Sequence, residues 1–197
     1  DEDTSFALML EAEQRGHRVD HCLAQDLFLE GRALGVNARR ARSSRQTEPP
    51  IRLGDPEDVA VHDYDVVFLR KDPPFDDDYL FLSLVLEHAR GGPLLVNDPR
   101  GLRDANEKLY TAWFSELMPE TLVTNDEKRI KAFVEKLGGR GVVKPLTGKG
   151  GEGVFAVQAG DPNINAILET VTHEGRRLAM AQRFLPAVQK GDKRILL

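Results

Sequence analysis

Apolar runs alternate with stretches of helical periodicity through the first half of the chain, in the pattern of an α/β protein. Residues 65–69 (DVVFL) and 93–97 (PLLVN) are short, apolar and bounded by turns, which predicts two buried strands. Between them, residues 76–78 offer carboxylate caps for a helix over 79–90, which two glycines end. A strand, a helix and a strand in this order indicate a βαβ unit and a parallel sheet.

The pattern before residue 64 is less regular. Residues 3–5 carry N-cap oxygens and apolar residues follow at helical spacing until Gly16, so we expect a helix there and a strand over 17–23. From 33 to 58 the periodicity fails, and we expect a mobile, solvated loop, with a phosphate-binding patch as the alternative. Four arginines lie in that segment among Ser, Pro and Gly: Arg39, Arg40, Arg42 and Arg45.

The character of the sequence changes near residue 120. A long helical stretch that follows Asp98 ends before Pro119. The segments after it predict a strand over 121–124, a helix capped at Asn125 or Asp126, antiparallel strands near 141–144, 153–157 and 178–184, and a helix over 163–173. We therefore predict two domains, a doubly wound parallel α/β domain over 1–119 and an α+β domain over 120–197.

Composition and charge exclude or disfavour several classes of protein. The chain has 197 residues, with 27 Lys and Arg against 32 Asp and Glu, and lacks the basic surplus typical of nucleic-acid binding. No apolar run approaches the roughly 18 residues of a membrane helix, and no basic-then-apolar leader is visible. The single cysteine, Cys22, excludes an internal disulfide or a cysteine zinc cluster. We expect a cytoplasmic protein that binds neither nucleic acid nor membrane.

The segment GKGGEG at 148–153 is the most informative motif. Its spacing matches G-x-G-x-x-G, but the dinucleotide fingerprint requires a following helix, and residues 154–157 have the pattern of a strand. No Lys-Ser or Lys-Thr follows, which excludes a Walker loop, and a kinase would place its lysine strand after the glycines, whereas Lys144 precedes them. A strand, glycine loop and strand remain. With Lys144 and Lys149 nearby, a phosphate-binding loop is favoured over a tight hairpin without a ligand.

Three further segments have polar or apolar groups that suit a nucleotide or an anion. Residues 181–186 predict a strand that runs into a proline, where free backbone groups suit an adenine edge and Phe184 or Leu185 suits its face; an ordinary core strand end fits equally well. Residues 191–194 (GDKR) are either a solvated turn or a ribose-binding Asp with a phosphate-facing Arg. Arg70 and Lys71 directly follow a predicted strand, where an open α/β sheet binds ligands, and two cations there suit an anionic substrate.

These motifs together resemble bacterial glutathione synthetases, which are ATP-grasp ligases. The resemblance covers nearly the whole chain and is least in the arginine-rich segment. It rests on RKDPPF at 70–75, LRDANEK at 102–108, AWFS at 112–115, PETLVT at 119–124, KPLTGKGG at 144–151 and GDKR at 191–194. It implies a substrate-binding N-terminal domain followed by the first part of an ATP-grasp domain. It also implies an enzyme that joins γ-glutamylcysteine to glycine with ATP and Mg²⁺, or Mn²⁺ in its place, as a homo-oligomer, commonly a tetramer.

The resemblance also implies roles for single residues. Lys108 and Lys144 match the lysines that hold the ATP phosphates, and Gly148, Gly150 and Gly151 lie in the loop that closes over the γ-phosphate. The expected adenine hinge consists of Gln182, Arg183, Phe184 and Leu185, and the expected ribose contact is Asp192. Arg194 matches an arginine that stabilises the acyl phosphate and the tetrahedral intermediate, and Arg70 with Ser5 is expected to hold the dipeptide.

Two parts of the family pattern are not found in this sequence. The chain begins at Asp1 without methionine and ends in what reads as the start of a strand, so we expect a piece of a longer protein. The family's magnesium ligands are expected after Leu197 and its first strand before Asp1, so no metal ligand is assigned in this chain. The alternatives are another ATP-grasp carboxylate–amine ligase, a non-catalytic ATP-binding module or, least favoured, a kinase.

Overall fold

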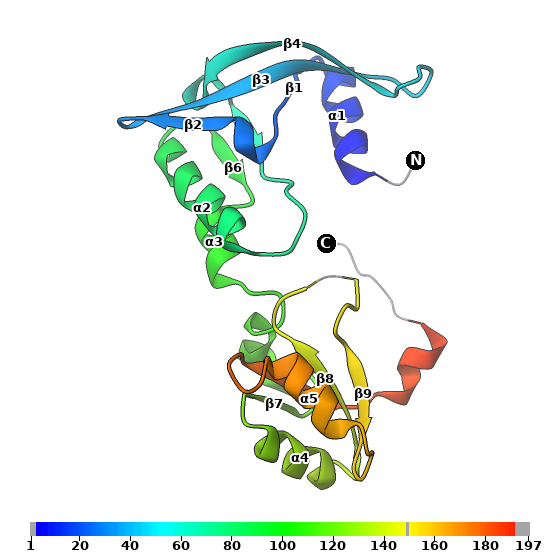
Figure 1. Cartoon of the computed structure of the whole chain (residues 1–197). Coiled ribbons are helices and arrows are strands. Elements are labelled where there is room, and N and C mark those ends of the chain that lie inside the picture. Colours follow the sequence, from blue (N-terminus) through cyan, green and yellow to red (C-terminus); the bar gives the residue numbers. More distant parts are fainter. Residues whose placement is uncertain (1–2, 149, 192–197) are drawn as a thin grey trace. The chain divides into compact units, whose positions relative to one another are not determined.

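The computed structural model describes residues 3–148 and 150–191, and the chain divides into two compact units (Figure 1). The N-terminal unit consists of Asp1–Asp72 and Asp76–Arg103, and the C-terminal unit of Pro73–Phe75 and Asp104–Leu197. Each unit has its own cluster of buried apolar side chains. The N-terminal unit mixes parallel and antiparallel strands with helices, and the C-terminal unit is α+β, which confirms the expected fold class.

An antiparallel sheet makes up much of the N-terminal unit. Its strand β3 pairs with all three other described strands of this sheet. The elements are α1 (Thr4–Gln14), β1 (Asp20–His21), η1 (Ala24–Asp26), β2 (Leu27–Glu30), β3 (Ala33–Ser43), β4 (Ile51–Ala60) and η2 (Val61–Asp63). The expected first helix is confirmed, with Asp3 as its N-cap, whereas only Asp20–His21 of the strand expected over 17–23 forms.

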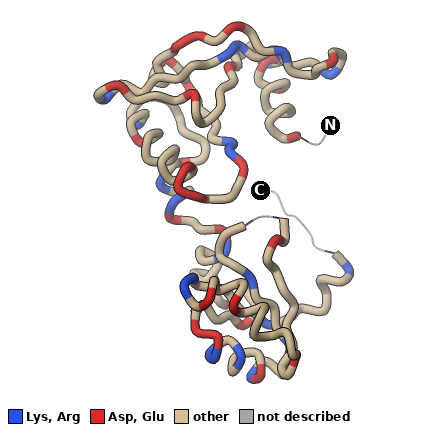
Figure 2. The backbone as a smooth tube through the Cα atoms, in the orientation of Figure 1, with Lys and Arg blue, Asp and Glu red and all other residues tan. Residues whose placement is uncertain are grey.

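The expectation of a mobile, solvated loop over 33–58 is wrong, because most of this segment forms the long hairpin of β3 and β4. Leu34, Val36 and Ala38 alternate into the core, and a bulge between Arg39 and Ala41 then shifts the alternation, so that Ala41 is fully buried. Because alanine is only weakly apolar and the bulge interrupts the register, the alternation of buried and exposed residues that marks a strand is not visible in the sequence. Basic and acidic residues are interspersed along the hairpin (Figure 2).

Ion pairs hold the arginines of this hairpin to neighbouring elements. Arg42 lies 3.3 Å from Glu13 of α1, and the same carboxylate accepts a hydrogen bond from the backbone of Ser43. Arg40 lies 3.7 Å from Asp20, whose side chain is only 4% exposed. Their partners lie far away in the sequence, so these arginines are part of the folded unit rather than of a solvated run.

The predicted βαβ unit is confirmed. Strands β5 (Val66–Phe68) and β6 (Leu94–Val96) pair in parallel, with Val67 opposite Leu95. Helix α2 (Asp77–Leu86) connects them and begins at the N-cap Asp76, whose carboxylate accepts from the backbone N–H of Tyr79 at 2.9 Å. Apolar side chains of α2 pack with those of β3 in the core of this unit. The short helices η3 (Glu87–Ala89) and α3 (Pro99–Asp104) follow α2 and β6.

The C-terminal unit contains an antiparallel sheet with the described strand order β7-β10-β8-β9. Its strands are β7 (Thr121–Thr124), β8 (Arg140–Pro145), β9 (Phe155–Gln158) and β10 (Ala179–Arg183). Its helices are η4 (Tyr110–Leu117), α4 (Glu127–Lys136), α5 (Ile164–Thr172) and η5 (Pro186–Lys190). The predicted strands and the helices α4 and α5 are confirmed. The long helix expected after Asp98 is instead α3 and η4, separated near Asn106.

The helices α4 and α5 pack on one face of this sheet (Figure 1). Val143 of β8 and Ala179 and Ala181 of β10 point into that core and are fully buried. Because side chains alternate along a strand, Lys144 and Gln182 point to the opposite face. We call this second side the open face; it carries the candidate site. Among the described helices, none is long and apolar enough to cross a membrane.

A cluster of charged residues follows α2 in the N-terminal unit. The carboxylate of Glu87 accepts hydrogen bonds from Arg103 at 2.6 Å and from Arg90, and Arg100 lies 3.4 Å away. Arg103 also donates to the hydroxyl of Ser83. The hydrogen bonds from Arg90 and then Arg103 lower the pKa of Glu87 from 4.5 to about 2.

We expect this cluster to make the N-terminal unit sensitive to acid. The folded state favours the charged form of Glu87. The contribution of Glu87 to the free energy of unfolding is therefore present above pH 4.5 and is lost as the pH falls towards about 2. Glu87→Gln should therefore flatten the fall of the unfolding free energy across this window, measured by urea unfolding at a series of pH values. Glu30→Gln, at the exposed end of β2, is the control and should keep the wild-type slope. Parallel profiles for Glu87→Gln and wild type would contradict the assignment.

Candidate functional site

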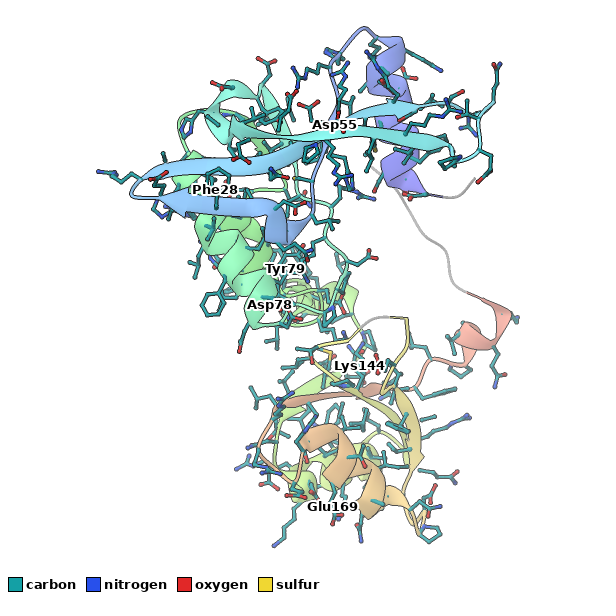
Figure 3. All side chains as sticks on the ribbon, turned by 45° about the horizontal axis from the view of Figure 1, so that its top comes forward. Phe28, Asp55, Asp78, Tyr79, Lys144 and Glu169 are labelled. Carbon is teal, nitrogen blue, oxygen red and sulfur yellow. The ribbon has the colours of Figure 1, made fainter. Side chains whose placement is uncertain are left out.

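A cavity of about 340 Å³ lies on the open face of the C-terminal unit. Strand β8 contributes Val142 and Lys144, and the turn before η4 contributes Lys108. The loop between β8 and β9 contributes Gly148, Gly150 and Gly151. Figure 3 shows Lys144 beside this loop, away from α5. The volume is at the lower end of the range of about 300–1,000 Å³ for small-molecule sites.

The cavity holds two ammonium groups. The side chain of Lys108 is 14% exposed; its Nζ donates to the carbonyl oxygen of Gly148 at 3.3 Å and pairs with the carboxylate of Glu107. Burial and then the charge of Lys108 lower the pKa of Lys144, whereas Glu107 acts in the opposite direction. Two carboxylates, those of Glu107 and Glu152, line the same cavity, and the side chain of Glu107 is 58% exposed. Two partly buried ammonium groups beside a glycine loop suit an anion such as a polyphosphate.

The loop that borders the cavity depends on its glycines. Gly148, Gly150, Gly151 and Gly153 all have a positive φ, between 61° and 106°, which other residues rarely adopt. A Cβ added at Gly150 or Gly151 would meet no atom within 4 Å, so the backbone there is open to an incoming ligand. The predicted order of strand, glycine loop and strand is confirmed by β8, this loop and β9.

The expected adenine hinge lies at the end of β10 and beyond it. Gln182 lies on the open face, opposite Val142 of β8, and donates to the Thr121 hydroxyl at 2.8 Å. The Leu185 side chain is half exposed. Gln182 thus lies on the same face of the sheet as Lys144.

The side chains of Arg183 and Phe184, which lie between Gln182 and Leu185 in the expected hinge, contact other residues of the unit. Arg183 forms a bidentate pair with Glu120, with both distances 2.6 Å, and this pair lowers the pKa of Glu120 to about 2. The Arg140 guanidinium lies 3.7 Å from the centre of the Phe184 ring. The backbone N–H of Arg183 also donates to the carbonyl oxygen of Glu120 at 3.0 Å, and the hinge role of Arg183 and Phe184 stays a prediction.

The N-terminal unit brings together the two residues expected to hold the dipeptide. Arg70 Nε donates to the Ser5 hydroxyl at 3.4 Å, although 65 positions separate them in the sequence. Lys71, which follows Arg70, lies 3.8 Å from Asp76 and 4.9 Å from the centre of the Tyr79 ring. Asp192 and Arg194, expected at the ribose and at the reacting groups, lie outside the described residues, as does Lys149.

Sequence reasoning assigned no role to Asn106 and Glu107, although both occur in the quoted motif LRDANEK. Glu107 lines the cavity, and Asn106 holds the turn that carries Lys108 through hydrogen bonds to the backbone of Lys108 and Leu109. The signal available in the sequence was an asparagine two residues before Lys108, a common turn arrangement.

Solved structures show the class of fold. The chain matches the ATP-grasp ligase PsnB, solved with a precursor variant, Mg and ADP, with a TM-score of 0.52 and 18% identity over 94% of this chain and 63% of that chain. It also matches the D-cycloserine synthetase DcsG, with a TM-score of 0.52 and 16% identity over 64% of this chain and 46% of that chain. The fold is that of ATP-grasp ligases.

Sequence comparisons show the family. Residues 1–103 match the N-terminal domain of prokaryotic glutathione synthetase, and residues 107–197 match its ATP-grasp domain. The chain therefore belongs to the prokaryotic glutathione synthetase family, which confirms the resemblance. It is 45% identical to the glutathione synthetases of Salmonella typhimurium strain LT2 and Shewanella oneidensis, and 44% to that of Escherichia coli strain K12, over 99% of its length. The chain spans 62% of the length of these relatives.

We expect Lys144→Met to weaken ATP binding without destabilising the fold. The fold disfavours the charged form of Lys144, so removing this charge should leave the melting temperature unchanged or higher. Losing a charge-assisted contact to phosphate should raise the dissociation constant of ATP about 10-fold or more. Calorimetric titration and thermal melting measure the two effects. Lys128→Met, on α4 at the other side of the sheet, is the control; equal ATP affinity for Lys144→Met and wild type would exclude the role.

We expect Gly150→Ala to impair ATP use through backbone strain alone. Its φ of 61° costs an alanine roughly 1–2 kcal/mol, while the added Cβ meets no atom within 4 Å. If that conformation forms the ATP-bound loop, the KM for ATP should rise about 10-fold. Gly138→Ala is a matched control, with a φ of 90° and equally open surroundings at the end of α4. It should lower the melting temperature and leave the KM unchanged, and the same KM for both variants would refute the assignment.

Proposed function

We propose that the complete protein is an ATP-dependent carboxylate–amine ligase that joins γ-glutamylcysteine to glycine and so forms glutathione. The observation that carries the proposal is the pair Lys108 and Lys144 in a cavity bordered by the glycine loop. It occurs in a chain of the prokaryotic glutathione synthetase family. Two ammonium groups and an accessible backbone suit the phosphates of ATP, because they neutralise charge that is present in the substrate and redistributed during transfer.

In this proposal the two units bind different substrates. The C-terminal unit binds ATP, with the phosphates at Lys108 and Lys144, the adenine at the hinge from Gln182 to Leu185, and the ribose at Asp192. The shared open face of Lys144 and Gln182 supports this arrangement. The N-terminal unit binds the dipeptide at Arg70 and Ser5, and the hydrogen bond between these two side chains supports a common site.

The chemistry explains why the reaction needs positive charge at the phosphates. A carboxylate does not condense with an amine in water, because its oxygen is a poor leaving group. The cysteinyl carboxylate therefore attacks the γ-phosphorus of ATP, the bond from this phosphorus to the bridging oxygen breaks, and ADP leaves. The amine of glycine attacks the resulting acyl phosphate, loses a proton, and displaces phosphate. Lys108, Lys144 and Arg194 hold the reacting groups and offset the charge that moves between them.

Water must be kept away from the acyl phosphate, which would otherwise hydrolyse. We assign this role to the loop with Gly148, Gly150 and Gly151; the open surroundings of Gly150 and Gly151 leave space for movement over a bound nucleotide. Mg²⁺, or Mn²⁺ in its place, would supply further charge neutralisation at the phosphate oxygens. Among the described residues no three His, Cys, Asp or Glu side chains gather as a metal site, and we assign no ligand to it.

The remaining proposals follow from the family resemblance. We propose a substrate-binding domain followed by the beginning of the ATP-grasp domain; the boundary expected between residues 119 and 120 falls inside the C-terminal unit, whose main segment begins at Asp104. We also propose that the complete protein acts in the cytoplasm as a homo-oligomer, a tetramer in the pattern of the family.

The activity can be tested by phosphate release from ATP with the complete protein. We expect release to require both γ-glutamylcysteine and glycine, with glutathione identified by mass spectrometry. Arg194→Ala should lower kcat by about 100-fold, the scale for one lost group that stabilises developing charge. Arg70→Met should raise the KM for the dipeptide and leave that for ATP unchanged. Release with a different pair of amino acids would indicate another ligase, and ATP binding without release a non-catalytic module; either result overturns the proposal.

A further inference from the structure

Asn106 connects two segments of the C-terminal unit that lie 40 positions apart in the sequence. Its Oδ1 accepts hydrogen bonds from the backbone N–H groups of Lys108 at 3.0 Å and Leu109 at 2.9 Å. Its Nδ2 donates to the carbonyl oxygen of Leu146 at 3.2 Å. One amide group therefore orders the turn that carries Lys108 and ties this turn to the chain just beyond Lys144.

This connection acts against an electrostatic repulsion. Lys108 and Lys144 border the same cavity, and the charge of Lys108 contributes to the lowered pKa of Lys144. Lys144 is fixed because β8 pairs with β10 on one edge and β9 on the other. Lys108 lies in a turn outside any described strand, and its segment needs a separate anchor. The hydrogen bond from Asn106 to Leu146 supplies it, and the contact from Lys108 to the carbonyl of Gly148 adds a second link.

We propose that Asn106 is a positioning residue, whose amide sets the place of Lys108 relative to Lys144 so that both ammonium groups meet one polyphosphate chain. This inference rests on the proposed binding of ATP. In this proposal Asn106 acts through Lys108, without contact to the nucleotide or the reacting atoms. The role requires a side chain that accepts from the backbone of the turn and also donates to the Leu146 carbonyl oxygen. A serine hydroxyl is too short to reach both partners, and an ionised carboxylate has no hydrogen to donate.

The test compares nucleotides with and without a phosphate chain, in the complete protein. Asn106→Ser keeps an acceptor for the turn and loses the link to Leu146. We expect its dissociation constant for ATP to rise about 10-fold and that for adenosine to stay within about twofold, because only the phosphates meet the lysines. The KM for ATP should rise with it, and the KM for γ-glutamylcysteine should not. A merely structural role would weaken every ligand together.

A second variant and a matched control complete the test. Asn106→Asp keeps the cap but places an acceptor against the Leu146 carbonyl, and we expect at least the same selective loss. Asn125→Ser removes a similar link, since Asn125 Nδ2 donates to the Gly175 carbonyl oxygen at 2.6 Å across 50 positions of the same unit. This control should lower the melting temperature comparably and leave the affinity for ATP unchanged.

The possible outcomes separate this inference from the proposed function. If the wild type binds ATP and both Asn106 variants bind it equally well, or if they lose ATP and adenosine to the same extent, the inference is wrong and the proposed function stands. Loss of ATP affinity in Asn125→Ser as large as in Asn106→Ser would also overturn it. If the wild type binds ATP but does not form glutathione, the proposed function fails, and a selective loss in Asn106→Ser still supports the positioning role. A wild type that does not bind ATP overturns both.

Discussion

The placement of two lysines in one small cavity is the constraint on which the C-terminal unit depends. The charge of Lys108 lowers the pKa of Lys144, Glu107 acts in the opposite direction, and Glu152 also lines the cavity. The other face of the sheet is a buried apolar core, where Val143 and its neighbours hold β8 in place. The sheet therefore holds Lys144 where burial and a neighbouring ammonium group both disfavour its charged form.

Much of the fold could be predicted where the pattern of the sequence is local. Strands β5, β6, β8 and β10 are short apolar runs between turn residues, and α2 and α4 begin at carboxylate caps, so propensity and packing agree. The hairpin of β3 and β4 could not be predicted, because small alanines and a bulge hide the alternation of β3, and both strands form through backbone pairing rather than through a local apolar run. The break between α3 and η4 was missed for a similar reason, since Asn106 bonds a carbonyl 40 positions away.

In the candidate site too, features set by neighbouring residues could be predicted from the sequence, whereas contacts between distant residues could not. The glycine loop and Lys144 were recognisable from the sequence, because the conformational freedom of glycine and the position of a lysine on the preceding strand are local properties. The pairing of Arg70 with Ser5 was suggested only by the family resemblance. No local pattern could show that the side chain of Arg183 is taken up by Glu120, or that the Phe184 ring is covered by Arg140.

The lowered pKa of Lys144 has a consequence for how the cavity exchanges with its surroundings. Under the proposed function, a polyphosphate beside this amine would favour its charged form, so binding of the nucleotide at alkaline pH would be accompanied by uptake of a proton and its departure by release of one. The heat of association then includes the ionisation heat of whichever buffer supplies that proton. Occupancy of the cavity and the acidity of the medium are thereby linked through a single side chain.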